Sequence, residues 1–334
     1  MNPMVEAYRL CDELPTRRTL DLETVLVAGA SGYIGGRLVP ELVARGYRVR
    51  VMVRSKVEAV SDRWSNCEVV VADALNPESL TAAMEGVHTV FYLIHSMLVG
   101  PKSFADADRS AARWVRESAE QQGVKRIIYL GGLGDKRVRL SPHLSSRMAV
   151  ADELALGSVP VTFLRAAIIL GSGSASYEMM NHLIRRLWVL PVPGWAKTRC
   201  QPIALRDVIK VLVGVLELPE TAGKIFDIGG PDILSYEELL KTHADVLGRR
   251  RKFIPSPLSS IPFFAMMTSW LTPVPAPITR CLMESVEHDV VCEGSDILEV
   301  LPFRRISCRE ALVLALSREE QDAVHSRWTD SYPP

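Results

Sequence analysis

The stretch VLVAGASGYIGGRLV, residues 25–39, carries the strongest structural signal, because a short β-branched run stops at glycine and a helical pattern begins at once. Its glycines Gly29, Gly32 and Gly35 are spaced GxxGxxG. Gly29 permits a tight turn, Gly32 lets the backbone approach a pyrophosphate, and Gly35 lets helix and strand pack closely. The free N–H groups of the helix N-terminus then attract phosphate. The stretch predicts a dinucleotide site, although a tight turn without a ligand would show the same spacing.

Strand and helix patterns alternate from this stretch onward. Predicted strands lie at residues 24–29, 47–54, 68–72, 89–94, 124–130 and 160–165, and the main helical patterns between them lie at 35–45, 76–85, 104–121 and 145–156. Connections of this length hold crossover helices. The alternation therefore predicts an α/β fold, a Rossmann-type doubly wound parallel sheet.

The alternation breaks at about residue 172, where proline becomes dense. Short strand patterns at 199–203 and 224–228 then lie between helical patterns at 205–216 and 235–247. We therefore expect three parts, namely a flexible leader at 1–22, an NAD(P)-binding Rossmann core at 23–171, and a smaller, mostly helical substrate region at 172–334 that closes over the cleft.

Composition and charge exclude several classes of protein. The 334 residues contain 39 Lys+Arg and 39 Asp+Glu, so nothing indicates a nucleic-acid partner. Six cysteines form no CxxC pair, which argues against a metal site or a disulfide framework and favours a reducing cytoplasm. No signal peptide is evident. The apolar stretch 258–271 is too short to span a bilayer. We expect a buried or amphipathic helix there, with membrane-surface contact as the less favoured alternative.

The end of the second predicted strand discriminates between dinucleotides. An NAD site usually has Asp or Glu here to bind the ribose 2′-OH, whereas this chain has Arg54, Ser55 and Lys56. Arg54 can bind a 2′-phosphate bidentately and Ser55 can donate a hydrogen bond to it, so NADP(H) is favoured over NAD(H). A solvated arginine at a strand end is the alternative. Asp73, which precedes Ala74 after the third strand, would reach the adenine amino group or cap the following turn.

With these features the chain resembles the short-chain dehydrogenase/reductase superfamily. More narrowly, it is similar to the atypical, NmrA-like and YbjT-like NAD(P)H-binding branch, which is related to the NADPH-binding accessory subunit of respiratory complex I. The likeness includes FYLIHSM at 91–97, SPHLSSRMAVADEL at 141–154, PVTFLRAAIILGSGSASYEMM at 160–180, TRCQPIALRDV at 198–208 and FDIGGPDILSYEELL at 226–240. The resemblance implies a Rossmann fold and a nicotinamide dinucleotide cofactor, and it leaves the substrate open.

The resemblance also implies which residues bind the cofactor. They come from the glycine loop and from the ends of successive strands, because open α/β sheets bind ligands at the carboxyl ends of their strands. The predicted set is Gly29, Ser31, Gly32, Tyr33, Ile34, Gly35, Arg54, Ser55, Asp73, Ala74, Ile94, His95, Arg147 and Ala167.

The catalytic pattern departs from that of typical family enzymes, which use a YxxxK pair on the helix after the fifth strand and a serine near that strand's end. Here His143 and Arg147 occupy the places of Tyr and Lys, and Gly131 and Gly132 stand where the serine is expected. His143 can serve as a general acid near neutral pH, and Arg147 can hold the ribose or an anionic substrate. Alternatively, His143 helps to start the helix and Arg147 packs along its surface.

Four residues are predicted to bind the substrate, namely Tyr177, Trp188, Arg199 and Gln201. The two aromatic residues would line an apolar pocket with Met180 and Trp195, although such residues at helical spacing more often belong to a core. By resemblance, Arg199 and Gln201 lie on a short strand that faces the cleft.

Two functions are compatible with these patterns, and an enzyme is the preferred hypothesis. It would be an NADPH-dependent oxidoreductase that transfers hydride to a small apolar substrate, with proton delivery by His143 or water. The second is a non-catalytic NADP(H)-binding redox sensor or assembly subunit, which the missing Ser and Tyr favour. The same missing pair disfavours a sugar-nucleotide epimerase or dehydratase. The oligomeric state stays open.

Overall fold

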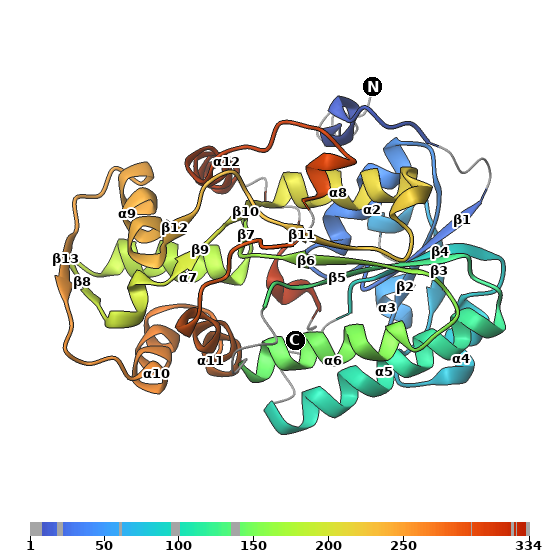
Figure 1. Cartoon of the computed structure of the whole chain (residues 1–334), viewed down its shortest axis with the longest axis horizontal. Helices are drawn as coiled ribbons and strands as arrows, with labels where there is room; N and C mark the ends of the chain where they lie inside the picture. The colour runs from blue at the N-terminus through green and yellow to red at the C-terminus, as the bar shows by residue number, and fades with distance from the viewer. Residues whose placement is uncertain are drawn as a thin grey trace.

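A parallel sheet of seven strands forms the centre of the molecule in the computed structural model, which describes residues 9–18, 23–59, 62–94, 101–134, 141–294, 296–321, 324 and 326–331. Across the sheet the strands follow the order β11-β6-β5-β4-β1-β2-β3 (Figure 1). They are β1 (Thr24–Ala28), β2 (Arg48–Val53), β3 (Glu68–Val71), β4 (Val87–Tyr92), β5 (Arg126–Gly132), β6 (Val161–Ala166) and β11 (Ile225–Ile228). The strand order reverses between β1 and β4, which confirms the predicted doubly wound Rossmann fold.

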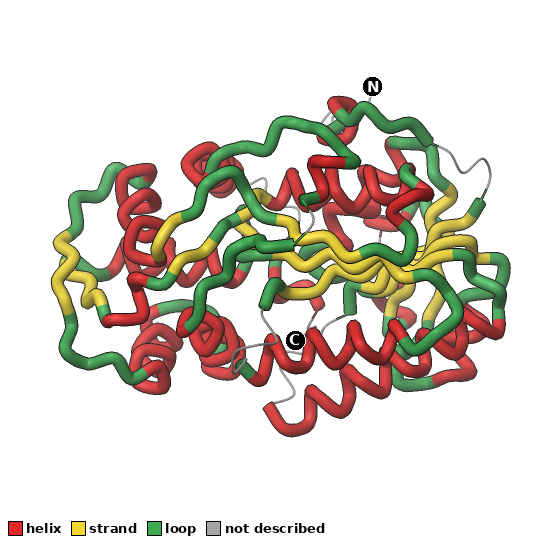
Figure 2. Tube along the Cα trace, in the orientation of Figure 1, coloured by secondary structure: helices red, strands yellow, loops and turns green. Residues whose placement is uncertain are grey.

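Helices cover both faces of the sheet (Figure 2). On one face α2 (Gly35–Ala44) packs against α8 (Leu205–Glu217), and their apolar side chains form a core with β1 and β2. On the other face α4 (Pro77–Ala83), α5 (Pro101–Gln121) and α6 (Pro142–Ala155) enclose a second core. Because both faces are covered, β1 is buried along its whole length and forms a continuous apolar run in the sequence.

The seventh strand comes from the region that the sequence analysis placed outside the core. β11 pairs in parallel with β6, which puts Asp227 beside Arg165. Arg165 Nε donates to Asp227 Oδ1 at 2.6 Å, and the other oxygen of this buried carboxylate accepts from the N–H groups of Glu293 and Gly294. Since α8 and β11 bring residues 205–228 back to the sheet, the Rossmann core does not end at residue 171.

The remaining elements extend the molecule beyond the carboxyl ends of the strands (Figure 1). They include the helices α7 (Ala175–Arg186), α9 (Tyr236–Val246), α10 (Ile261–Leu271), α11 (Ala276–Glu284) and α12 (Cys308–Glu320). Short strands pair between them, β7 (Ile169–Leu170) with β10 (Ile203–Ala204), β9 (Arg199–Cys200) with β12 (Leu234–Ser235), and β8 (Val189–Val192) with β13 (Lys252–Pro255). The helix expected in the apolar stretch 258–271 is α10. Among the described helices, none combines the length and hydrophobicity that a bilayer crossing requires.

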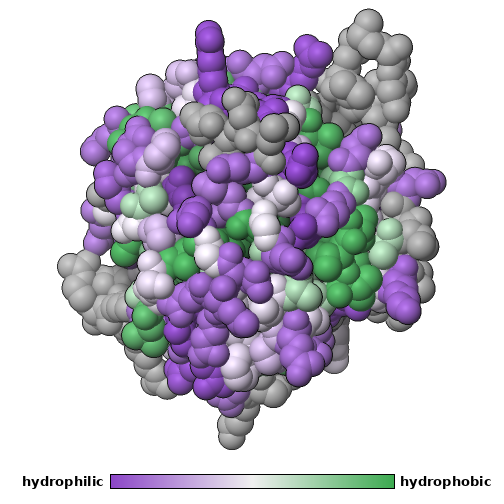
Figure 3. Space-filling model, turned by 90° about the vertical axis from the view of Figure 1, so that its right-hand side faces the viewer, coloured by the Kyte–Doolittle hydropathy of each residue, from purple (hydrophilic) through white to green (hydrophobic). Residues whose placement is uncertain are grey.

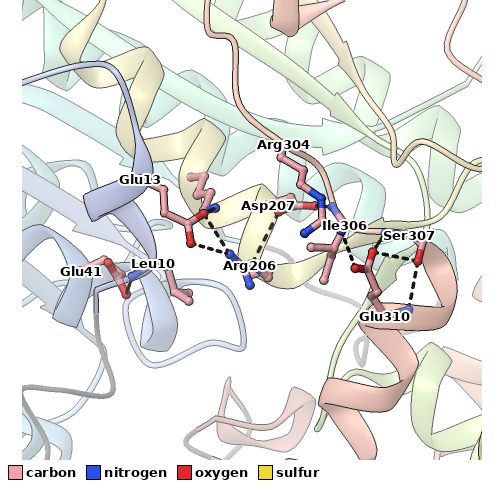
Figure 4. A network of polar contacts seen from close by, with 10 residues as sticks. Leu10, Glu13, Glu41, Arg206, Asp207, Arg304, Ile306, Ser307 and Glu310 are labelled. Atoms are coloured by element: carbon pink, nitrogen blue, oxygen red, sulfur yellow. Dashed lines mark hydrogen bonds and ion pairs between the residues drawn. The ribbon is translucent and has the colours of Figure 1, made fainter.

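Segments from the N-terminal and C-terminal parts of the chain meet on α8 (Figure 4). Arg206 binds Glu13, and the buried Lys210 pairs with the same carboxylate, which lowers the pKa of Glu13. Asp207, the residue after Arg206 on α8, accepts a hydrogen bond through Oδ2 from the N–H of Ile306 at 2.9 Å. Ile306 directly precedes Ser307, where the capping box of α12 begins. These contacts hold both segments against the core.

Candidate active site

The glycine loop forms the turn that the sequence predicts. Gly29 adopts φ 94°, a left-handed conformation that favours glycine, and a Cβ on it would lie 2.9 Å from the carbonyl of Leu93. A Cβ on Gly35 would lie 2.2 Å from the carbonyl oxygen of Gly29. The first turn of α2 therefore lies directly against the end of β1. No described side chain caps this helix, and the N–H groups of Gly36 and Arg37 donate to the carbonyls of Gly32 and Ile34. The helix therefore suits the phosphates of a dinucleotide mainly through the positive end of its dipole at the glycine loop.

A C-terminal segment lies against the same loop. Ser326 Oγ donates to the carbonyl of Tyr33 at 2.9 Å and accepts from Arg37 Nε at 2.8 Å. The backbone N–H of Trp328 donates to the carbonyl of Gly173 at 2.9 Å, two residues before α7. The segment thereby bridges the start of α2 and the start of α7, and Trp328 reaches the cavity beside them.

One continuous cavity of about 430 Å³ leads from the glycine loop to the C-terminal helices. Its cofactor end is formed by the loop and by the carboxyl ends of β5 and β6, and the predicted residues there are Gly29, Gly32, Tyr33, Ile34, Gly35 and Ala167. Its far end is formed by α7, α9, α10 and α11, with Met179, Leu183, Trp195, Leu240, Thr268 and Leu282 among the lining residues. The loop and the apolar far wall therefore enclose the same space.

The lining is almost wholly uncharged. Among the lining residues that the structure describes, Arg147 is the only one with a formal charge. Hydroxyl groups come from serines, from Thr268 and from Tyr33 and Tyr236, and burial raises the pKa of both tyrosines. Apart from Arg147, the described lining offers no charge to replace the hydration that a charged group would lose, so the far wall suits an uncharged, mainly apolar ligand.

Arg147 joins the carboxyl ends of two strands at the cavity. Its guanidinium donates to the carbonyl of Ile94 at 3.3 Å and to that of Leu130, and it lies over the ring of Tyr129 at 5.0 Å from the centroid. The residue is only 8% exposed. Arg147 therefore holds the ends of β4 and β5 together and faces the cavity, which excludes the alternative of a side chain on the helix surface.

Where the catalytic serine is expected, this chain has glycines, which present no side chain to the cavity. Gly131 and Gly132 line the cavity, and a Cβ on Gly132 would lie 2.9 Å from the side chain of Leu144. His143 is the second residue of α6, and its side chain lies outside the described part of the structure. His95 lies outside the described residues altogether.

The predicted adenosine end lies at the ends of β2 and β3. Arg54 directly follows β2 and is exposed, next to the half-buried Ser55. After β3, Asp73 Oδ1 accepts from the N–H of Leu75 at 2.9 Å, so this carboxylate stabilises the turn that leads to α4. Ala74 is buried in the same turn. Since β2 and β3 are neighbours in the sheet, Arg54 and Asp73 lie at the same edge. Ser31 is half-buried in the glycine loop.

The two aromatic residues predicted to bind substrate have other positions. Tyr177 is fully buried, stacks on His243 with ring centroids 5.1 Å apart, and donates to Glu319 at 3.3 Å. Trp188 is 76% exposed and lies against Arg251. Neither is among the described lining residues of the cavity.

The two polar residues predicted to bind substrate stabilise loops instead. Arg199 pairs with Asp289 at 2.8 Å on the surface. The buried Gln201 donates to the carbonyl of Gly230 at 2.7 Å and accepts from the N–H of Cys292 at 3.0 Å. The weaker candidates Met180 and Trp195 do line the cavity.

Most of the far wall was not singled out from the sequence. Leu183, Leu239, Leu240 and Met283 face the cavity from three different helices. Each is an ordinary apolar position of an amphipathic pattern, so no sequence signal separates it from a core residue. The sequence signals for this wall are Met180, Trp195 and the dense apolar composition of the stretch 258–271.

Known proteins share the sequence pattern of this site. A family described as NAD(P)H-binding matches residues 29–159. Cinnamoyl-CoA reductase 1 of Oryza sativa is 33% identical over 68% of this chain and 77% of its own length. Subunit 9 of the mitochondrial NADH dehydrogenase (ubiquinone) 1 alpha subcomplex of Arabidopsis thaliana is 25% identical over 69% of this chain, and the match spans 60% of that protein. Photosystem II assembly factor Ycf39 of Trieres chinensis is 22% identical, with 70% and 72% covered.

Solved structures share the architecture. A nucleoside-diphosphate-sugar epimerase of Staphylococcus aureus has a TM-score of 0.73 at 20% identity, covering 87% of this chain and 100% of its own. The triphenylmethane reductase of Citrobacter sp. has a TM-score of 0.71 at 20% identity, covering 89% and 100%. At these identities the similarity establishes the fold and not the reaction.

Proposed function

Because this chain belongs to the NAD(P)H-binding, atypical branch of the short-chain dehydrogenase/reductase superfamily, we propose that it is an NADP(H)-dependent reductase of an uncharged, apolar substrate. The continuity of the cavity carries this proposal, since the glycine loop and the apolar far wall line the same space. A dinucleotide held by the loop and a ligand held by the far wall would therefore share one enclosed site, as hydride transfer requires.

The residues at the cofactor end fit a dinucleotide. Gly29 and Gly35 keep two positions of the loop free of side chains, and the start of α2 places the positive end of the helix dipole at the loop, which favours phosphate. In the proposal Arg54 binds the 2′-phosphate, and Arg147 supports the nicotinamide end through the strand termini that it holds together. When bound, the reduced nicotinamide supplies a hydride.

The lining limits the class of substrate. Arg147 is the one charged lining residue, and two backbone carbonyls already accept hydrogen bonds from it. A carboxylate or phosphate on the substrate would therefore lose hydration without full compensation. Carbonyl, enone or quinone compounds with a hydrocarbon body match this lining better than sugar nucleotides do.

His143 is the proposed proton donor, because it stands at the tyrosine position of the family pattern and histidine is the side chain whose ordinary pKa lies nearest to neutral pH. We expect His143→Gln to lower turnover of an uncharged carbonyl, enone or quinone substrate at least about tenfold while NADPH affinity stays unchanged. The matched control is His288→Gln, which changes an exposed histidine that is not among the described lining residues of the cavity. Stopped-flow and steady-state NADPH oxidation measure the effect. Unchanged turnover in His143→Gln would exclude this residue and leave water as the proton source.

A second function has its own support. Gly131 and Gly132 leave the cavity without the serine of the family's carbonyl reductases, and two relatives are named as a subunit and an assembly factor of larger complexes. A non-catalytic NADP(H)-binding sensor or assembly subunit would bind NADPH stoichiometrically. It would not oxidise NADPH when tested with a panel of carbonyl, enone and quinone compounds. Turnover of even one compound favours the reductase.

A further inference from the structure

One end of the molecule carries a surface that the cavity and the cofactor loop do not use. It lies at the left of Figure 1, the end of the molecule that carries α10, β8 and β13. Large apolar side chains are exposed there, namely Trp188, Ile254, Leu258, Phe263, Met266 and Trp270. Single exposed apolar residues are ordinary, whereas a group of them marks a contact surface. The opposite end of the molecule, which faces the viewer in Figure 3, is mainly hydrophilic with apolar areas between.

Helix α10 contributes the centre of this surface. Its sequence IPFFAMMTSWL contains no charged residue. Phe264 and Thr268 are buried, and Thr268 belongs to the cavity wall. Phe263, Met266 and Trp270 follow one another at helical spacing on the outer face, and Trp270 is 79% exposed. A helix that is apolar all round normally has a partner on both sides, and here the outer side faces solvent.

The same end of the molecule is cationic. The sequence contains no Asp or Glu from residue 179 to 206 or from residue 248 to 283, the two segments that pair as β8 and β13. The second segment begins with the run Arg249, Arg250, Arg251 and Lys252. Arg249, Arg250 and Lys252 are exposed, and within the described part of the chain no acidic side chain pairs with them. These three cations therefore have no ion-pair partner in the described part of the chain, and the acidic residue nearest to them in sequence is the exposed Asp245 near the end of α9.

The cations and the apolar side chains are neighbours in space. Arg251 Nε donates to the carbonyl of Ile184 at 2.7 Å, and its guanidinium lies 4.9 Å from the ring centroid of Trp188. Two residues after Ile184, Arg186 donates to the carbonyl of Leu271 at 2.6 Å, at the end of α10. The C-terminal end of α7 thus connects the basic run to α10.

We propose that this surface, the docking tip, binds peripherally to a membrane that contains anionic lipids. The docking tip is defined by its apolar residues Trp188, Ile254, Leu258, Phe263, Met266 and Trp270 and its cations Arg249, Arg250 and Lys252. Tryptophan prefers the headgroup level of a bilayer, and basic side chains near the surface are attracted to anionic lipids. No described helix can cross the bilayer, so the contact is interfacial. The charge favours this partner, because a second copy of the chain would bring the same cations together.

The proposal is independent of the reductase function, because it rests on the outer face of α10 and on β8 and β13, and none of the docking tip's residues is among the described lining residues of the cavity. If both hold, an apolar substrate dissolved in the lipid would lie next to the helices that enclose the site. A failure of nucleotide binding leaves the docking tip intact, and a failure of lipid binding leaves the cofactor site intact.

Flotation of the purified full chain with two kinds of vesicle tests the proposal. One kind consists of phosphatidylcholine alone, and in the other a part of the lipid is phosphatidylglycerol. We expect binding to the anionic vesicles, weakened by salt, and a fall of at least about tenfold in the bound-to-free ratio for Arg249→Glu/Arg250→Glu. Phe263→Ser/Trp270→Ser should lose binding even at low salt, since it removes the apolar contact.

A matched double variant controls for net charge. Lys125→Glu and Lys224→Glu together make the same charge change at exposed positions beside other strands, and this protein should bind like the parent. The three double variants are compared with the parent by circular dichroism and thermal unfolding, to exclude misfolding. Equal flotation of Arg249→Glu/Arg250→Glu and the control would overturn the proposal. The proposal would also be overturned if the parent were a dimer without affinity for lipid and Phe263→Ser/Trp270→Ser were a monomer. The docking tip would then be an interface between two copies of the chain.

Discussion

Gly35 sits where a helix and a strand end approach so closely that no methyl group fits between them. A Cβ there would lie 2.2 Å from the oxygen of Gly29 and 2.7 Å from the Cα of Ala30, both backbone atoms. Gly35→Ala should therefore push α2 away from β1, destabilise the protein by about 1–3 kcal/mol and weaken NADPH binding at least about tenfold. Denaturant unfolding and calorimetric titration measure the two effects.

The control is Gly194→Ala, because a Cβ on Gly194 would meet only Ser259 Oγ at 3.6 Å, an ordinary contact. This variant should keep the stability and the nucleotide affinity of the parent. Parental NADPH affinity in a folded Gly35→Ala protein would contradict the assignment of the loop as the phosphate site.

The loop residues were predictable from the sequence, because their signal is local. Gly29 and Gly35 are needed by a turn that residues 29–35 define, and the structure has that turn. Trp188 and Arg199 were not predictable in the same way, since a side chain at a strand end can face a cleft or solvent depending on segments far away. Trp188 lies against Arg251, and Arg199 lies against Asp289.

Helices α7 and α9 are joined by the stacked rings of Tyr177 and His243, and this contact makes stability depend on pH. His243 is 1% exposed, and burial lowers its pKa to about 4 from an ordinary 6.5. The unfolded chain then takes up a proton at a higher pH than the folded protein. The contribution of the neutral, buried imidazole to the folding free energy is complete above about pH 6.5 and is lost as the pH falls toward 4.

The variant His243→Phe tests this contact, because it keeps a ring beside Tyr177 and removes the titrating group. Between neutral pH and about pH 4.5 the parent should lose about 2 kcal/mol more folding free energy than the variant. Denaturant unfolding at the two pH values measures it. His288→Phe, a change at an exposed histidine, should behave as the parent. An equal loss in the parent and in His243→Phe would contradict the account.

Elements with a strong local pattern were predicted, the short strand at 224–228 included, whereas positions in the fold that depend on distant partners were not. The six central strands and their helices follow from apolar runs and glycine signals. β11 has only four residues, and its place beside β6 depends on the Arg165–Asp227 pair, which joins positions 62 residues apart. The helix α10 was expected from its apolar composition, whereas its exposed outer face depends on how it packs on α7.

The cavity forms only when distant parts of the chain come together in the folded molecule. Its walls come from the glycine loop, from strand ends, from helices in the second half of the chain and from Trp328 near the C-terminus. None of these segments forms a pocket alone, so the sequence predicts the cofactor end through a local motif and cannot place the substrate end. The docking tip is likewise a product of assembly, because β8, β13 and α10 become neighbours only in the folded chain.

The most direct test of the account is a calorimetric titration of the purified protein with NADPH and with NADH. We expect NADPH to bind at least about tenfold more tightly, about 1.4 kcal/mol. Arg54→Glu should abolish this preference. Arg48→Glu, a change at the opposite end of the same strand, should preserve it. Equal affinities in the parent would contradict the NADP(H) assignment, and binding of neither nucleotide would contradict the dinucleotide site itself.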